Sequence, residues 1–183
     1  SLAPLNGHLR LFTTPDAAGH RQVIALIGQA RRSIHMVMFH LTDTSVVRAL
    51  VKARAEGKEV KVILDRAGLR HSRLRRAAQE LRSGGVAVHE SSREFSISHE
   101  KAMLIDGKRT VVMSMNLTKA FAKTRDYGLV IDSPTVAQEF DEVFAADWRD
   151  QRAFRPTHRC ANLVYSPFDS IWRLLGMIDS ARH

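Results

Sequence analysis

Hydrophobic residues recur along the chain with two different periods, and the alternation of these periods predicts strands and helices in turn. Val60, Val62 and Leu64 alternate along one segment, as in a strand. Val23, Leu26 and Ile27 recur instead at helical spacing. The full pattern predicts strands at residues 9–13, 34–40, 59–64, 86–89, 97–105, 110–115 and 126–131, and helices around residues 23–30, 44–57, 72–82 and 134–148.

Several of these elements carry their own start and stop signals. Asp43 or Thr44 can cap the second helix, and Gly57 ends it. Pro134 suits the first turn of the last helix. The run at 34–40 is nearly all apolar, which favours a strand buried on both faces. The order of elements therefore predicts an α/β domain over residues 5–150, with a central mixed sheet between helices on both faces.

The segment after this domain repeats the beginning of the chain. Residues 151–162 form a polar linker, and residues 163–183 then show a short strand pattern, a Ser-Pro turn and a helix pattern, as the opening residues do with Thr-Pro. Ile27, Ala30 and Arg31 correspond to Ile178, Ala181 and Arg182. We expect the start of a second, truncated copy of the same lobe. The alternative is two unrelated amphipathic helices that each follow a turn.

Charge and composition narrow the class of partner without identifying it. The 183 residues contain 28 Lys and Arg against 19 Asp and Glu, a formal net charge of +9, which favours nucleic acid or an anionic membrane surface. No apolar run is long enough to span a membrane, and no leader peptide is visible. The single cysteine forms no internal disulfide, and the nine histidines lack metal-binding spacing. The compartment stays open, and we expect no cofactor and no metal.

One short string carries the candidate chemistry. His99 and Lys101 are two residues apart in a predicted strand, so both side chains project from one face. Ser114 and Asn116 are two apart in the next predicted strand, and the four groups converge if the strands are neighbours. An imidazole can attack phosphorus and form a covalent intermediate, while an ammonium and an amide stabilise charge on the phosphate oxygens. The set therefore predicts phosphodiester chemistry.

This string resembles the signature of the phospholipase D superfamily, in which His-x-Lys is followed by four residues, an Asp and then a Gly-Ser-x-Asn segment. Here the series is His99, Lys101, Asp106, Ser114 and Asn116. The flanking strand that ends in Asp65 and the last helix are also similar to the two-lobed subgroup that contains bacterial cardiolipin synthases. The resemblance implies a phospholipase D-like α/β/α sandwich that works through a phosphohistidine, without metal.

The resemblance also implies a role for each residue. His99 would be the nucleophile or its mirror-image general acid, and Lys101, Ser114 and Asn116 would bind the phosphate. Asp106 completes the motif but has the opposite strand parity, so we expect it to support the structure. Asp126 could accept a hydrogen bond from His99 and fix its tautomer. Met113 replaces the usual glycine of the family, and its parity predicts that it packs in a layer away from the pocket.

Three functions compete on this evidence. The first is a phospholipid phosphodiesterase or phosphatidyltransferase, peripheral to a bacterial membrane or exported. The second is a nuclease of the same superfamily, and the third is a basic binding module without catalysis. A second motif is expected from another lobe of the same chain or from a homodimer mate. A basic cluster could bind lipid phosphates or nucleic acid, or could be a solvated helix face; its members are Arg66, Arg70, His71, Arg73, Arg75, Arg76 and Arg82.

Overall fold

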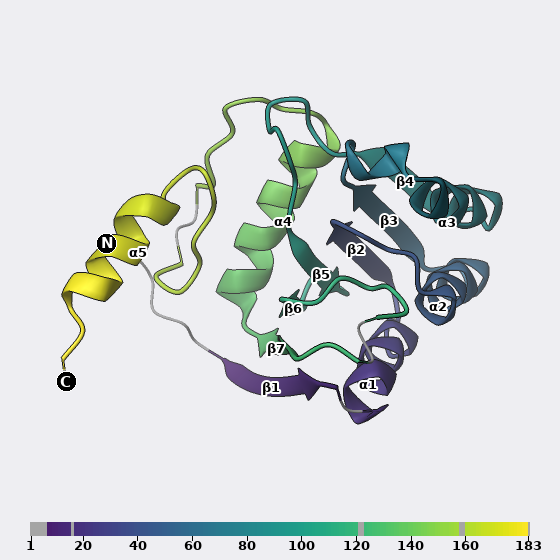
Figure 1. Ribbon diagram of the computed structural model, residues 1–183, viewed down its shortest axis with the longest axis horizontal. Coiled ribbons are helices and arrows are strands. Elements are labelled where there is room, and N and C mark those ends of the chain that lie inside the picture. The colour runs from purple at the N-terminus through teal and green to yellow at the C-terminus, as the bar shows by residue number, and fades with distance from the viewer. Residues whose placement is uncertain (1–6, 16, 121–122, 158–159, 183) are drawn as a thin grey trace.

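A mixed β-sheet forms the centre of the molecule (Figure 1). The computed structural model describes residues 7–182 except 16, 121–122 and 158–159. Within these residues seven strands pair in the order β1-β7-β6-β5-β2-β3-β4. β2, β3 and β4 are parallel, and the other pairs are antiparallel. The strands are β1 (His8–Thr14), β2 (Ser33–Met38), β3 (Glu59–Leu64), β4 (Ala87–Glu90), β5 (Lys101–Ile105), β6 (Arg109–Met113) and β7 (Asp126–Asp132).

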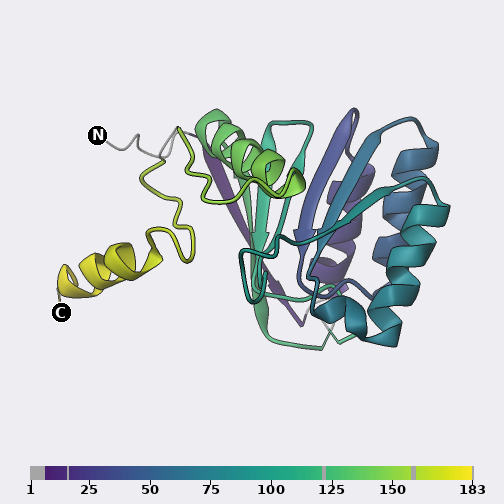
Figure 2. The ribbon, with the colours of Figure 1, turned by 90° about the horizontal axis from the view of Figure 1, so that it is seen from above.

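Helices cover both faces of the sheet, which confirms the predicted α/β/α sandwich (Figure 2). On one face lie α1 (Ala17–Gly28), α2 (Thr44–Ala55) and α3 (Ser72–Ser83), and on the other lies α4 (Pro134–Trp148). A short 3-10 helix, η1 (Gly68–Arg70), follows β3. The alternation along β5 separates the two layers, because Met103 packs with the α1–α3 core whereas Leu104 packs with α4.

The predicted and observed elements differ chiefly where the strands end. β2 stops at Met38, β5 begins only at Lys101, and β6 stops at Met113. His99, Ser114 and Asn116 therefore lie just outside strands, and the expectation that they sit within them was wrong. Side chains explain the late start of β5 and the early end of β6: the Ser98 amide donates to the Asp65 carboxylate, and the Ser114 hydroxyl accepts the Tyr127 amide hydrogen. Backbone groups held in this way are not available to extend the ladder.

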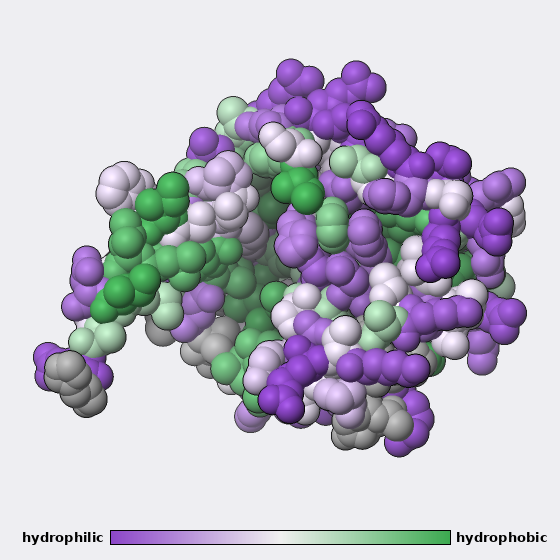
Figure 3. Space-filling model, viewed as in Figure 1, coloured by the Kyte–Doolittle hydropathy of each residue, from purple (hydrophilic) through white to green (hydrophobic). Residues whose placement is uncertain are grey.

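The C-terminal segment lies outside these layers (Figure 2). Helix α5 (Ser170–Asp179) buries none of its side chains, and six large apolar residues on it are 47–78% exposed (Figure 3). The short strand predicted from Leu163 is not formed, since residues 163–165 have no regular secondary structure. Leu163 packs instead against a small cluster with Ile131, Val136 and Cys160. A second lobe beginning at residue 163 stays a prediction.

None of the helices in the described part of the chain combines the length and the apolar character that a membrane crossing requires.

Candidate active site

His99 and Lys101 meet at the sheet edge where β2 ends and β5 begins. Lys101 is the first residue of β5 and is 5% exposed, whereas His99 precedes the strand and is exposed. The Lys101 Nζ lies 3.2 Å from the His99 Nδ1 and 2.6 Å from the His99 carbonyl oxygen. The buried ammonium is thus held directly beside an accessible imidazole, although only Lys101 lies in the strand.

The electrostatics of this pair favour a neutral imidazole. Partial desolvation and the Lys101 charge lower the pKa of His99 from its usual value near 6.5, and Asp65 acts in the opposite direction. Burial lowers the pKa of Lys101, and Asp126 opposes that shift. A neutral imidazole next to a cation provides a nucleophile and a phosphate-oxygen ligand in one place.

Ser114 and Asp126 form a hydrogen-bonded group on the neighbouring strands. The Ser114 hydroxyl donates to the Asp126 Oδ1 over 2.9 Å and accepts the Tyr127 amide hydrogen over 3.0 Å. The Thr124 hydroxyl also donates to the Asp126 carboxylate. The Asp126 carboxylate accepts hydrogen bonds from these two hydroxyls rather than from His99, and its charge opposes the lowering of the Lys101 pKa.

Asn116 is held at the end of β2. The Leu117 amide donates to the His40 carbonyl, and the Leu117 carbonyl accepts from the Thr42 and Asp43 amides. Among the described residues, the Asn116 Oδ1 is a buried oxygen without a hydrogen-bond partner. Such an atom is costly to leave unpaired, so it suits a residue that completes its hydrogen bonds with a ligand. Met113 packs in the core, as its parity predicted, and does not fill the site.

Asp106 does not join this group. It follows β5 at the opposite end of the strand from Lys101. Its carboxylate accepts the amide hydrogens of Arg31, Arg32 and Ser33 over 2.7–3.0 Å. Asp106 therefore ties the loop after α1 to the turn after β5.

Residues outside the motif also lie at this site. The Phe39 ring lies 4.6 Å from the His99 ring and 5.1 Å from the Lys101 Nζ, and it stacks on His40 at 4.1 Å. His71 lies edge-on to His40 at 6.1 Å. Phe39 was not singled out by the sequence analysis. The available signal was position, because Phe39 and His40 follow the carboxyl end of β2, where open α/β sheets bind ligands.

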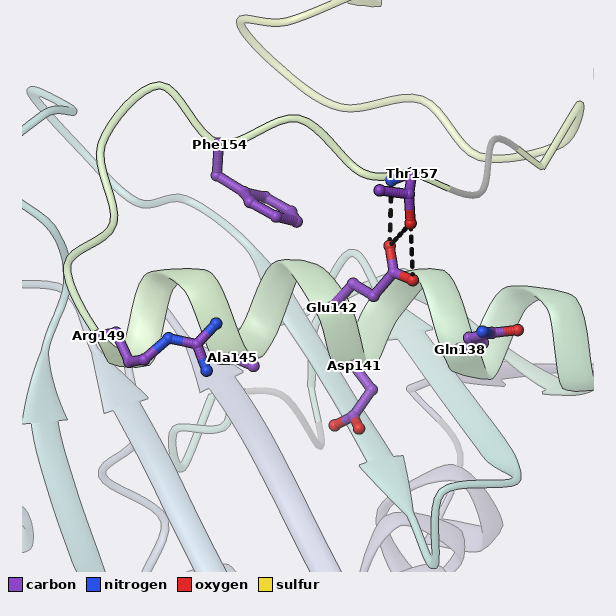
Figure 4. Close-up of a pocket in the computed structure, with 7 residues that line it drawn as sticks. All are labelled: Gln138, Asp141, Glu142, Ala145, Arg149, Phe154 and Thr157. Atoms are coloured by element: carbon purple, nitrogen blue, oxygen red, sulfur yellow. Dashed lines mark hydrogen bonds between the residues drawn. The ribbon is translucent and has the colours of Figure 1, made fainter.

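Two surface hollows flank α4. One, of about 350 Å³, lies between α4 and the segment after it, where the Thr157 hydroxyl donates to Glu142 (Figure 4). No candidate catalytic residue lines it. The other, of about 310 Å³, lies beyond the carboxyl end of β4. Its lining includes three arginines and three acidic residues: Arg66, Arg82, Arg93, Glu90, Asp147 and Asp150. The second hollow brings two members of the predicted basic cluster to the same sheet edge as His99.

Comparisons with known proteins agree with this geometry. The sequence model of the family described as cardiolipin synthase, PLD-like domain, matches residues 23–148. A phospholipase D of Rickettsia conorii is 29% identical over 142 residues, which are 76% of this chain and 67% of that protein. A mitochondrial cardiolipin hydrolase of Xenopus laevis is 28% identical over 137 residues, 74% of this chain and 63% of that protein.

A solved structure shares both fold and sequence. Nuc from Salmonella typhimurium, a phospholipase D family member, superposes with a TM-score of 0.75 at 26% identity. The match covers 82% of this chain and 99% of that chain. The chain therefore belongs to the family of cardiolipin synthase-type, phospholipase D-like domains.

Proposed function

We propose that the protein is a phosphodiesterase or phosphatidyltransferase that acts on phospholipids through a covalent phosphohistidine at His99. The observation that carries the proposal is the contact between an exposed, neutral imidazole and the buried Lys101 ammonium, in a chain of this family. The relatives named phospholipase D and cardiolipin hydrolase support a phospholipid as the substrate. A basic surface near the site is compatible with anionic lipid headgroups and peripheral contact with a membrane.

The first step forms a bond between His99 and phosphorus. Because Lys101 contacts Nδ1, the His99 Nε2 is the nitrogen that we expect to reach the phosphate. As the phosphate binds, the ammonium turns to its non-bridging oxygens, Nδ1 carries the imidazole proton, and Nε2 attacks. The phosphorus–oxygen bond to the leaving alcohol breaks, and a second acid supplies the proton that the alcohol needs. Ser114 and Asn116 are expected to bind the same oxygens as Lys101.

The second step regenerates the free His99 imidazole. Water or an acceptor alcohol attacks phosphorus, the second group takes its proton, and the nitrogen–phosphorus bond breaks. Imidazole and ammonium groups suffice for both steps, so we expect turnover to survive exhaustive chelation of divalent metals. Loss of activity with a chelator and its return with one added metal would contradict this mechanism.

The mechanism requires a second acid–base group opposite His99. His99 is exposed at the sheet edge, so one lobe presents half of a pocket. We propose that a second His-x-Lys motif comes from another lobe of the same polypeptide or from a homodimer mate. Sedimentation combined with turnover assays distinguishes these cases, and full activity of a strictly monomeric single lobe would refute the need for a second motif.

A nuclease activity is the second candidate, and one observation favours it. The match to Nuc covers almost the whole of that chain. In addition, three arginines lie, together with three acidic residues, in the hollow beyond the carboxyl end of β4. A phosphodiester backbone could use the same His99 chemistry, with arginines binding neighbouring phosphates. Parallel turnover assays on anionic phospholipid vesicles and on single-stranded DNA decide which substrate the site prefers.

The covalent intermediate provides the direct test. We expect rapid acid-free quenching during turnover to trap a phosphorylated adduct, visible as an intact-mass increase and mapped to His99 by peptide fragmentation. His99→Ala should abolish the adduct. His8→Ala is a matched control, because His8 is also exposed but begins the edge strand β1, three places from β5 in the sheet. An adduct of unchanged yield in the His99→Ala protein would refute the proposal.

A further inference from the structure

Asp65 is a buried carboxylate directly beneath the catalytic edge. It follows β3 and is 2% exposed. Its Oδ2 accepts the Gly68 amide hydrogen over 2.7 Å, and its Oδ1 accepts the Ser98 amide hydrogen over 2.9 Å. The two oxygens therefore join the turn after β3 to the residue that precedes His99. A charged acceptor makes hydrogen bonds roughly twice as strong as a neutral one.

The segment that carries His99 depends on such contacts. Residues 91–100 connect β4 to β5 without strand pairing, so no ladder fixes the backbone of His99. On the other side of His99, the Phe39 amide donates to the Glu100 carbonyl over 3.0 Å. After His99, the backbone is held by this bond to Phe39, which follows β2, and the Lys101 Nζ donates to the His99 carbonyl oxygen itself. Before His99, the backbone is held by the bond from the Ser98 amide to Asp65. Losing that bond would remove this anchor from the N-terminal side of His99.

Side chains around Asp65 pack closely against Gly68 in the turn after β3. A Cβ added to Gly68 would lie 3.3 Å from the Asp65 Oδ2, 3.3 Å from the His40 Cδ2 and 3.0 Å from a Leu74 methyl carbon. Glycine at this position therefore lets the carboxylate and the His40 ring come together at the carboxyl ends of β2 and β3. A larger residue would push the turn away from the segment that it anchors.

Charge gives Asp65 a second effect on the same histidine. The cationic and titratable groups that face this site are Lys101, His40 and His71, and Asp126 acts on Lys101 from β7. Asp65 raises the pKa of both His99 and His40 against desolvation and the neighbouring positive charge. Its carboxylate thus offsets part of the desolvation and positive charge that together lower the pKa of His99.

We propose that Asp65 is a positioning residue for His99, holding the backbone before the nucleophile and balancing the positive charge around it. The importance of Asp65 to catalysis rests on the proposed function. The positioning of His99 by Asp65 does not, because it can be measured without turnover. Asparagine cannot replace Asp65, since its amide has one acceptor oxygen for two backbone N–H groups.

Nuclear magnetic resonance titration of the full chain tests this directly. In Asp65→Asn we expect the His99 pKa to fall by about half a unit or more, because a nearby anion is lost. We expect the Ser98 amide to exchange with solvent about 10-fold faster, since a bond of about 1.4 kcal/mol no longer protects it. His99→Gln assigns the imidazole signal. Asp106→Asn is the matched control, a carboxylate that also accepts backbone amides but at the far end of β5, and it should change neither quantity.

Asp65→Glu covers the case in which Asp65→Asn does not fold. It keeps the charge but displaces the oxygens, so the His99 pKa should stay near that of the wild type while Ser98 exchange accelerates. An unchanged His99 pKa and unchanged Ser98 protection in Asp65→Asn would overturn the positioning role. Turnover separates the two proposals: activity retained by His99→Ala contradicts the proposed function, whereas full kcat in Asp65→Asn with an inactive His99→Ala contradicts only the role of Asp65.

Discussion

The two ends of β5 carry two halves of one motif, and they are built in opposite ways. At the Lys101 end lie the exposed His99 imidazole and, after β6, a buried Asn116 oxygen that has no hydrogen-bond partner among the described residues. At the Asp106 end, about 16 Å away for a strand of this length, the carboxylate oxygens are engaged by backbone amides. Residues of one signature can therefore have separate duties, one chemical and one structural.

Among the substitutions that distinguish the two ends of β5, the largest loss of turnover is expected at His99. In the active assembly, His99→Ala should lower phosphodiester turnover by about 10³-fold or more, because the group that forms the covalent bond is missing. The thermal midpoint should hardly change, since His99 is exposed. Steady-state kinetics and thermal unfolding of the same preparation provide the check. Loss of the same size in Asp106→Ala, at equal folded fraction, would remove the distinction between the ends.

Lys101 is expected to show the next largest effect. Lys101→Met keeps the length of the buried side chain but removes the charge that stabilises the phosphate oxygens, so kcat should fall by about 10²–10³-fold. The fold should be unaffected or slightly more stable, because a buried ammonium is desolvated at a cost. Lys61→Met is a suitable control, since Lys61 pairs with Glu59 on β3 instead. Wild-type kcat in Lys101→Met would show that the ammonium does not act on the transition state.

The sequence predicted the parts of the molecule that depend on repeated local patterns. The sheet and its covering helices follow from hydrophobic periodicity over many residues, and the parity argument placed Met113 in the core. The start of β5 and the end of β6 did not follow, because the Asp65 carboxylate and the Ser114 hydroxyl replace backbone partners there. The contact of Phe39 with His99 depends on the pairing of β2 with β5. The hydrogen bonds of Asp126 come from Ser114 and Thr124, which belong to different segments. Such long-range pairings have no periodic signal.

At the Asp106 end, the expected effect is on stability. Asp106→Ala should lower the free energy of unfolding by about 1–3 kcal/mol, because three backbone amides lose a charged acceptor. The positive φ of 56° adds to the cost, since alanine disfavours this conformation, whereas Asp106→Asn tolerates it and keeps one acceptor. Urea unfolding should therefore rank wild type above Asn and Asn above Ala, with turnover per folded molecule unchanged. Equal stability of all three proteins would contradict the structural role.

The response to pH gives the smallest effect. Activity, which depends on the Lys101 end, and stability, which depends on the Asp106 end, should change over different pH ranges. The His99 pKa lies below its usual value near 6.5, and the nucleophile must be neutral. We therefore expect kcat/KM to rise with pH through that lowered pKa and to level off near neutrality.

The Asp106 carboxylate accepts hydrogen bonds from backbone amides, and these hold its pKa below the usual 3.8. Its contribution to stability is therefore complete above the unfolded pKa and is lost as pH falls through the folded one. Between about pH 7 and pH 5, catalysis should decline while the stability difference between wild type and Asp106→Asn stays constant, and that difference should shrink only below about pH 4. Rate profiles and urea midpoints over this range measure both, and a stability difference that declined together with kcat/KM would show that the two ends are coupled.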